Sequence, residues 1–197
     1  MNLLITEQQT TAISLAGPEI CANCSRIGPT CCRCETGEEV LVAPLSADEW
    51  ERMQAMAPWT TLAGVVVREP NTAFFIEEMH RLFPDRSDEV AASFPLGGHH
   101  LRLAQNHLGQ CACLGPAGCL LPQEARPHFC HLYPFWFFSD RLQVFGDPQC
   151  LALRSLQTAD QLCNALHTTP QRLFDAYHAL CLAWGVPRPD RSQAVDD

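Results

Sequence analysis

The chain has 197 residues, 47% of them apolar and 18% charged, which is enough to bury a core without disulfides. Its net charge of −9 and pI of about 5.3, with 13 basic residues that form no run, argue against a nucleic-acid-binding face. Residues 1–20 do not resemble a secretion signal, and no stretch approaches the roughly 18 uninterrupted apolar residues of a membrane span.

The first half of the chain contains one clear helix signal after a weakly patterned arm over residues 1–20. Ser46-x-x-Glu49 forms a capping box, and Leu45 and Trp50 flank it as a hydrophobic staple. These residues predict a helix over 46–57, ended by Pro58. The other expected elements are strands at 40–43 and 65–67, a helix over 71–82 that Pro84 stops, and a short turn of helix over 88–93.

The second half contains two expected hairpins. Residues 100–105 and 110–114 alternate as strands around the turn residues 106–109, so the first hairpin delivers Cys111. Aromatic residues favour strands at 135–138 and 142–145, which form the second hairpin.

The C-terminal region is expected to be helical. Thr158-x-x-Gln161 resembles a capping box for a helix to about residue 167, and Thr169-Pro170 starts the strongest helix of the chain. One face of this second helix is apolar at a 3.6-residue period and holds Leu173, Phe174, Tyr177, Leu180, Cys181 and Trp184.

Twelve cysteines are the most informative feature of the composition. We expect a cytoplasmic protein, and in a reducing cytosol clustered cysteines more often bind metal or perform redox chemistry than form static disulfides. Cys21-x-x-Cys24 has the spacing of a metal-binding knuckle, in which a tight turn lets two sulfur atoms converge on one ion. Adjacent Cys31 and Cys32 point apart in an extended chain, so they favour two neighbouring sites or a multinuclear cluster.

A second group of cysteines, Cys111, Cys113, Cys119 and Cys130, lies far from the first in the sequence, and Cys150 follows a turn. Thiolates are soft ligands that suit zinc or iron–sulfur clusters. The ten cysteines outside the C-terminal helices are more than one tetrahedral site can use as ligands. Two four-sulfur sites, or one cluster with spare thiols, fit this count better.

Other interpretations apply to several of these residues. Cys163 and Cys181 are expected in the core, where cysteine behaves as a small hydrophobe. Redox dithiol chemistry at Cys21 and Cys24 stays open, although a thioredoxin-like βαβ context is missing.

His128 and His131 could be ligands but more simply lie beside or outside the ligand shell. Arg126 is expected to shape its loop and to pair with a carboxylate or with the negative thiolate site, while Tyr133-Pro134-Phe135 is expected to pack beside that site.

Taken in order, these motifs resemble the YkgJ-type cysteine-cluster family, which is described as a zinc- or iron-chelating domain. The residues that carry the resemblance are Cys21, Cys24, Cys31-Cys32, Cys111-Ala-Cys-Leu114, Gly118-Cys119, Arg126-Pro-His-Phe-Cys130, Tyr133-Pro134 and Cys150. The gap of six residues between Cys24 and Cys31 is longer than the short form of the motif, and Cys34 and Cys113 are additional.

The resemblance implies a metal or cluster held by about eight cysteines: Cys21, Cys24, Cys31, Cys32, Cys111, Cys119, Cys130 and Cys150. The family includes a domain of flagellin lysine N-methylases, which implies iron–sulfur-linked methyl transfer to a protein lysine. The chain shows neither a methyl-donor motif nor a separate substrate domain, so this activity is not carried over.

The sequence therefore predicts an α+β fold, mostly helical, with short β-hairpins that present cysteine-rich loops. Residues 21–155 are expected to form the metal-binding domain, with residues 156–187 as a helical hairpin packed on it and 188–197 as a tail. The expected function is to hold a cysteine-ligated iron–sulfur or zinc centre. The alternatives are a lysine-methyltransferase-like or redox enzyme that uses the centre, and a structural-zinc interaction module. A protein substrate or partner is left open, and neither nucleic acid nor membrane is expected.

Overall fold

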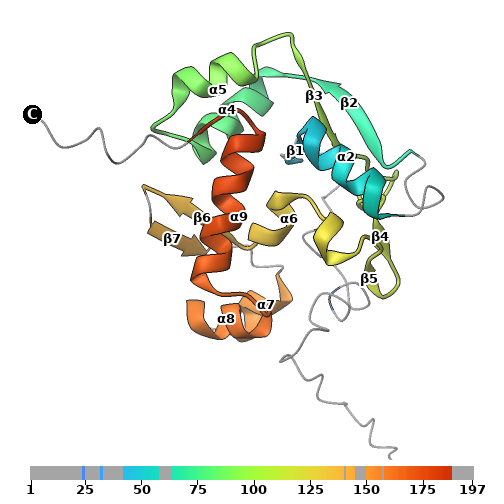
Figure 1. The fold of residues 1–197 in the computed structure, drawn as a ribbon, viewed down its shortest axis with the longest axis vertical. Helices are drawn as coiled ribbons and strands as arrows, with labels where there is room; N and C mark the ends of the chain where they lie inside the picture. The colour runs from blue at the N-terminus through green and yellow to red at the C-terminus, as the bar shows by residue number, and fades with distance from the viewer. Residues whose placement is uncertain are drawn as a thin grey trace, which may run out of the picture.

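The structure, a computed structural model, describes residues 24, 32, 42–57, 64–139, 141–144, 150–156 and 158–187. It confirms an α+β fold in which helices outweigh short antiparallel strand pairs. The elements, coloured along the chain in Figure 1, are β1 (Pro44–Leu45), α2 (Ala47–Met56), β2 (Val66–Pro70), α4 (Ala73–Leu82), α5 (Ser87–Ser93), β3 (His99–Leu103), β4 (Leu114–Gly115), β5 (Gly118–Cys119), the 3-10 helix η1 (Gln123–Ala125), α6 (His128–Leu132), β6 (Phe135–Phe138), β7 (Arg141–Val144), α7 (Leu151–Ser155), α8 (Ala159–Ala165) and α9 (Pro170–Ala183).

Local capping signals placed three helices correctly. Ser46 caps α2, and the reciprocal bonds between Ser46 and Glu49 complete the predicted capping box. The same box forms at Thr158 before α8. Thr169 caps α9, whose first residue is the predicted Pro170. These signals depend only on residues within one helical turn, which is why the sequence alone reveals them.

Other boundaries differ from the predictions. Helix α4 begins at Ala73 rather than residue 71, because the Thr72 side chain accepts a hydrogen bond from the Phe75 backbone and acts as the N-cap. Strand β2 continues to Pro70 because β3 pairs with it along its whole length. The strand expected at 40–43 is wrong for its described residues 42–43, since pairing with β3 begins only at Pro44.

Of the first expected hairpin, one isolated β-bridge forms in place of two paired strands. Strand β3 pairs with β2 and β1 in an antiparallel sheet of order β1-β3-β2, rather than with residues 110–114. Beyond β3 the chain still turns back over residues 106–109, and Gln105 bridges Cys111. The second hairpin is confirmed as β6 and β7, with Phe135 opposite Val144.

Two groups of buried side chains stabilise the fold. The larger core lies where α9 passes α6 and β6, and it also includes side chains of α4, α5 and α8 (Figure 1). Trp136 is its largest fully buried side chain, and the Trp136 indole donates to the Leu82 carbonyl at 3.0 Å. The smaller core lies between α2 and the sheet and contains Leu45, Met53, Ala57, Val65, Cys113 and Leu121. The predicted boundary between residues 155 and 156 stays a prediction.

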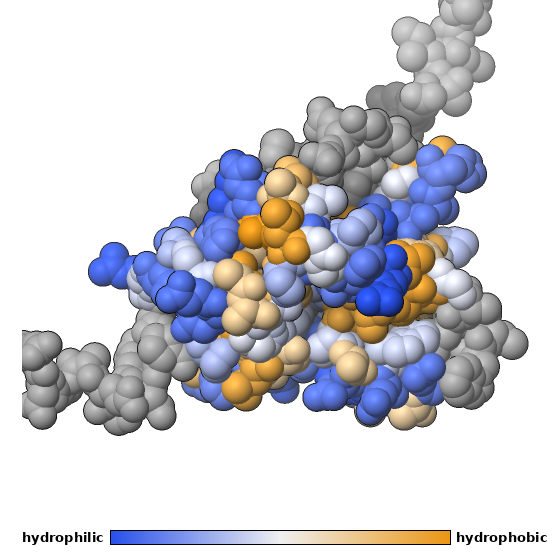
Figure 2. All heavy atoms as spheres, turned by 90° about the horizontal axis from the view of Figure 1, so that it is seen from above, coloured by the Kyte–Doolittle hydropathy of each residue, from blue (hydrophilic) through white to orange (hydrophobic). Residues whose placement is uncertain are grey.

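On the surface formed by the described residues, large apolar side chains are scattered. Figure 2 shows one face, on which hydrophilic residues separate several apolar areas. Among the residues that the structure describes, the large apolar ones that stay exposed are Met56, Leu96, Leu108, Leu120 and Leu182. Within the described ranges, no helix has the length and apolar character needed to span a membrane.

Candidate metal centre

The two cysteine segments meet at Cys32 and Cys111. The Cys111 backbone N–H donates to the Cys32 carbonyl at 2.7 Å, which joins the N-terminal segment to the central one. The Cys32 thiol is also close enough to interact electrostatically with three thiols of the central segment, those of Cys111, Cys119 and Cys130. Sulfur atoms far apart in the sequence therefore gather in one region.

A tight turn presents the next two cysteines. Strands β4 and β5 pair Leu114 with Cys119, and Gly118 closes the turn with φ +102°, a conformation that a side chain would strain. The Leu120 N–H donates to the Cys113 carbonyl at 2.8 Å, so the backbone holds the two ends of this loop together. Cys113 is 1% exposed and Cys119 is half-buried beside it.

Cys130 comes from α6, a short helix that the sequence did not reveal. Phe129 and Leu132 of this helix pack into the larger core, where Phe129 stacks on Trp184 with ring centres 6.3 Å apart. The His131 ring bonds the backbone of Gln123 and Arg126 in the preceding loop. With its neighbours fixed in this way, Cys130 keeps exposed surface and lies near the other thiols.

A hydrogen bond between two thiols separates their proton affinities. The Cys113 side chain bonds Cys111 and holds the pKa of Cys111 below its ordinary value, with the Cys113 backbone N–H acting in the same direction. The same thiol–thiol bond raises the pKa of Cys113, and burial raises it further. The thiol–thiol bond thus favours the thiolate form at Cys111 more than at Cys113.

Burial and neighbouring thiols disfavour the thiolate forms of Cys119 and Cys130. Burial raises the pKa of Cys119, although the Leu121 backbone N–H and the Arg126 guanidinium both lower it. Loss of water also raises the pKa of Cys130 well above its ordinary value, and the neighbouring thiols add to this. Cys130 nevertheless keeps solvent-accessible surface.

The donor set fits a soft metal. Several thiols whose negative charges repel one another become stable thiolates when a cation lies among them, because metal ligation replaces the proton on each sulfur. Backbone N–H groups that donate to Cys111 and Cys119 add the hydrogen bonds that ligating sulfur atoms commonly receive.

Arg126 and the two histidines have roles around this site. The Arg126 Nε donates to the Leu121 carbonyl at 3.2 Å, and its charge stabilises the Cys119 thiolate, in line with both roles expected of Arg126. Arg52 Nη1 lies 3.2 Å from His128 Nε2, so this nitrogen already has a partner. Burial lowers the pKa of both His128 and His131, which favours their neutral forms.

The predicted ligands are not all brought together. Cys21, Cys31 and Cys34 lie outside the described residues, and Cys24 is described as half-buried. Cys150 is the N-cap residue of α7 and packs beside the larger core, so its place in the ligand set stays a prediction. Cys163 and Cys181 are buried in that core, where the sequence placed them.

Proximity does not yet amount to a preformed coordination sphere. Across the residues that the structure describes, no three Cys, His, Asp or Glu side chains are already arranged to hold an ion. A centre made from these thiols therefore needs small side-chain movements or ligands from the undescribed N-terminal positions.

Sequence reasoning missed two residues of this site, Glu49 and Arg52. It includes Cys113 in the second cysteine group, as a thiol that replaces or supplements a ligand, but does not reveal its bond to Cys111. Glu49 was recognised only as a helix cap, and Arg52 was not singled out. The signal available was their spacing: positions 49 and 52 share one face of a helix, so a buried acid and a base there can act together on a neighbouring segment.

Comparisons with protein-family models, curated proteins and solved structures found no match to this chain. The resemblance to the YkgJ-type family consequently stays a prediction that depends on the order of the motifs.

Proposed function

We propose that this protein holds a cysteine-ligated metal centre, either zinc or an iron–sulfur cluster. The observation that carries the proposal is the approach of Cys32 to Cys111, Cys119 and Cys130, with Cys113 bonded beside them. Repulsion among these thiols would destabilise the thiolates without a cation, whereas a bound metal would turn the same arrangement into a stabilising one.

The proposed ligands are those of the motif set, Cys21, Cys24, Cys31, Cys32, Cys111, Cys119, Cys130 and Cys150. Cys113 joins them as a thiol that bonds Cys111 or replaces a ligand. Because the proposed ligands must stay reduced to bind metal, we place the protein in the cytoplasm.

Anaerobic purification followed by metal and sulfide analysis tests the proposal. We expect stoichiometric metal. A colourless protein with zinc identifies a zinc site, and broad visible absorption with inorganic sulfide identifies an iron–sulfur cluster. A protein that is isolated without metal and then takes up neither zinc nor iron with sulfide would overturn the proposal.

A second candidate function is redox or group-transfer chemistry at the same centre. It is favoured by one observation, the exposed surface of Cys130, because a purely structural zinc site keeps its sulfur atoms closed off. A reversible change in the visible spectrum on reduction would support redox chemistry. A zinc centre whose thiols resist alkylation would instead favour the structural interaction module.

A further inference from the structure

Two side chains of helix α2 form hydrogen bonds with the backbone of the segment that carries Cys130. Glu49 Oε1 accepts a hydrogen bond from the His128 backbone N–H at 2.8 Å, and Arg52 Nη2 donates to the Arg126 carbonyl at 3.0 Å. A third contact joins Arg52 Nη1 to the His128 ring at 3.2 Å. The two α2 side chains therefore hold the backbone on both sides of Pro127.

Glu49 supplies a cap that α6 lacks in its own sequence. Pro127 is the N-cap residue of α6 and offers no side-chain hydrogen bond, so the His128 N–H needs a partner from elsewhere. Glu49 is 1% exposed, and burial of a carboxylate is costly unless its oxygen atoms are hydrogen-bonded. Its second oxygen, Oε2, accepts from the Ser46 N–H at 2.9 Å, so one carboxylate caps α2 and α6 together.

The direction of Cys130 depends on this contact. Cys130 lies two residues after His128 in a helix of only five residues, so the anchoring of the first residue sets where the thiol points. Packing of Phe129 on Trp184 anchors the same helix to the larger core. Glu49 is also close enough for its charge to act on Cys130.

We propose that Glu49 and Arg52 are positioning residues of the metal centre, which hold Cys130 among the other ligands. This inference rests on the proposed function. Residues that orient metal ligands from outside the ligand shell typically contribute about 10- to 100-fold in metal affinity.

The test uses the full chain loaded with Co²⁺ alone, because thiolate-to-cobalt absorption reports the number of bound sulfur atoms. Glu49→Gln keeps the shape of the side chain but replaces one of the two carboxylate oxygens with an NH₂ group. Only one of the two backbone N–H groups, those of Ser46 and His128, then has an acceptor. We expect it to weaken Co²⁺ binding by about 10- to 100-fold and to lower the charge-transfer absorption per cobalt. The matched control, Glu51→Gln, changes an exposed acid of the same helix and should leave both unchanged.

A double-mutant cycle with Cys130→Ser distinguishes positioning from a general effect on stability. If Glu49 acts through Cys130, Glu49→Gln costs no further affinity once the Cys130 sulfur is gone. An equal loss in the Cys130→Ser background would overturn the inference. So would a Glu49→Gln protein that melts earlier yet binds Co²⁺ with unchanged affinity and spectrum, since that describes a helix cap alone.

Arg52→Met serves as the second variant if Glu49→Gln does not fold, with Arg81→Met, an exposed arginine of α4, as its control. The same loss of affinity and the same non-additivity with Cys130→Ser are expected. A wild-type chain that takes up neither Co²⁺ nor iron with sulfide would sink both the proposed function and this inference. Wild-type binding that neither variant weakens would overturn the inference alone.

Discussion

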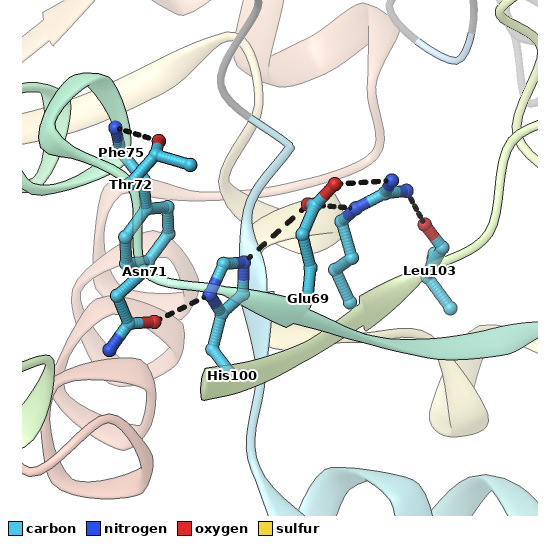
Figure 3. A network of polar contacts seen from close by, with 7 residues as sticks. Glu69, Asn71, Thr72, Phe75, His100 and Leu103 are labelled. Carbon is cyan, nitrogen blue, oxygen red and sulfur yellow. Dashed lines mark hydrogen bonds and ion pairs between the residues drawn. The ribbon is translucent and has the colours of Figure 1, made fainter. Parts of the chain in front are cut away.

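The thiol site and the polar network of the sheet are both groups of titratable side chains, but their charges are arranged in opposite ways. In the network, Arg102 donates to both oxygens of Glu69. Asn71 accepts from His100 Nδ1 at 2.8 Å (Figure 3). The hydrogen bond from Arg102 holds the pKa of Glu69 below its usual range. The thiol site instead gathers groups of one sign, and burial raises the pKa of Cys119 and Cys130.

This difference distinguishes the charge-paired network from the candidate binding site. In the network, Arg102 and Glu69 pair opposite charges within the protein. Under the proposed function, a metal ion would supply the positive charge at the thiolates. The following predictions test whether the two regions really differ in this way.

The largest expected effect is on metal binding when a central thiol is removed. Structural zinc sites bind with about 10–16 kcal/mol, so the loss of one ligand among four should weaken binding by about 100-fold or more. Cys111→Ser should show this loss in a competition titration with a chromophoric chelator. Cys163→Ala, in the larger core, should bind metal like the wild type; an unaffected Cys111→Ser would remove Cys111 from the site.

Metal removal should loosen one region and spare the other. After chelation under reducing conditions, we expect faster amide exchange at Cys111, Leu114 and Leu120, whose N–H groups donate within the cysteine loops. The paired β2 and β3 amides should exchange as before. Hydrogen exchange read by mass spectrometry compares the two sets, and equal acceleration in both would contradict a local metal-dependent site.

Breaking the polar network should affect stability but not metal affinity. Arg102→Met removes a pair whose side chains are 17% and 41% exposed, and pairs of this kind contribute about 0.5–1 kcal/mol. Urea unfolding should show a lower midpoint with an unchanged m-value. A variant that also loses metal would show that the two regions depend on each other.

The smallest expected effect is a change in how stability varies with pH. Burial lowers the pKa of His100 from its ordinary value of 6.5, so the unfolded chain takes up a proton before the folded one as pH falls. The stability that neutral His100 provides is present above pH 6.5 and is lost as pH falls through the folded pKa.

His100→Gln should flatten the slope of unfolding free energy between pH 7 and pH 5, measured by urea titration at each pH. His128 and His131 add slopes of the same sign, so part of the dependence should remain. The lowered pKa of Glu69 acts only below its ordinary value of 4.5, outside this range. An unchanged slope in His100→Gln would contradict the burial of neutral His100.

Sequence patterns predicted what depends on neighbouring residues. The capping boxes at Ser46 and Thr158, the Thr169-Pro170 helix start and the aromatic hairpin over 135–144 all follow from contacts within a few residues. Helix α6 was missed because a helix of five residues gives no readable period and because its cap, Glu49, comes from another helix. The bond between Cys113 and Cys111 was missed because spacing says nothing of which thiol faces which.

The double role of Glu49 has a consequence for metal exchange. Its bond to Ser46 spans one turn of α2 and needs no metal, so the acceptor for His128 would already be in place in the empty protein. The chain would then lose its ion and regain one without refolding α6, because the anchor of the Cys130 segment does not depend on the ion.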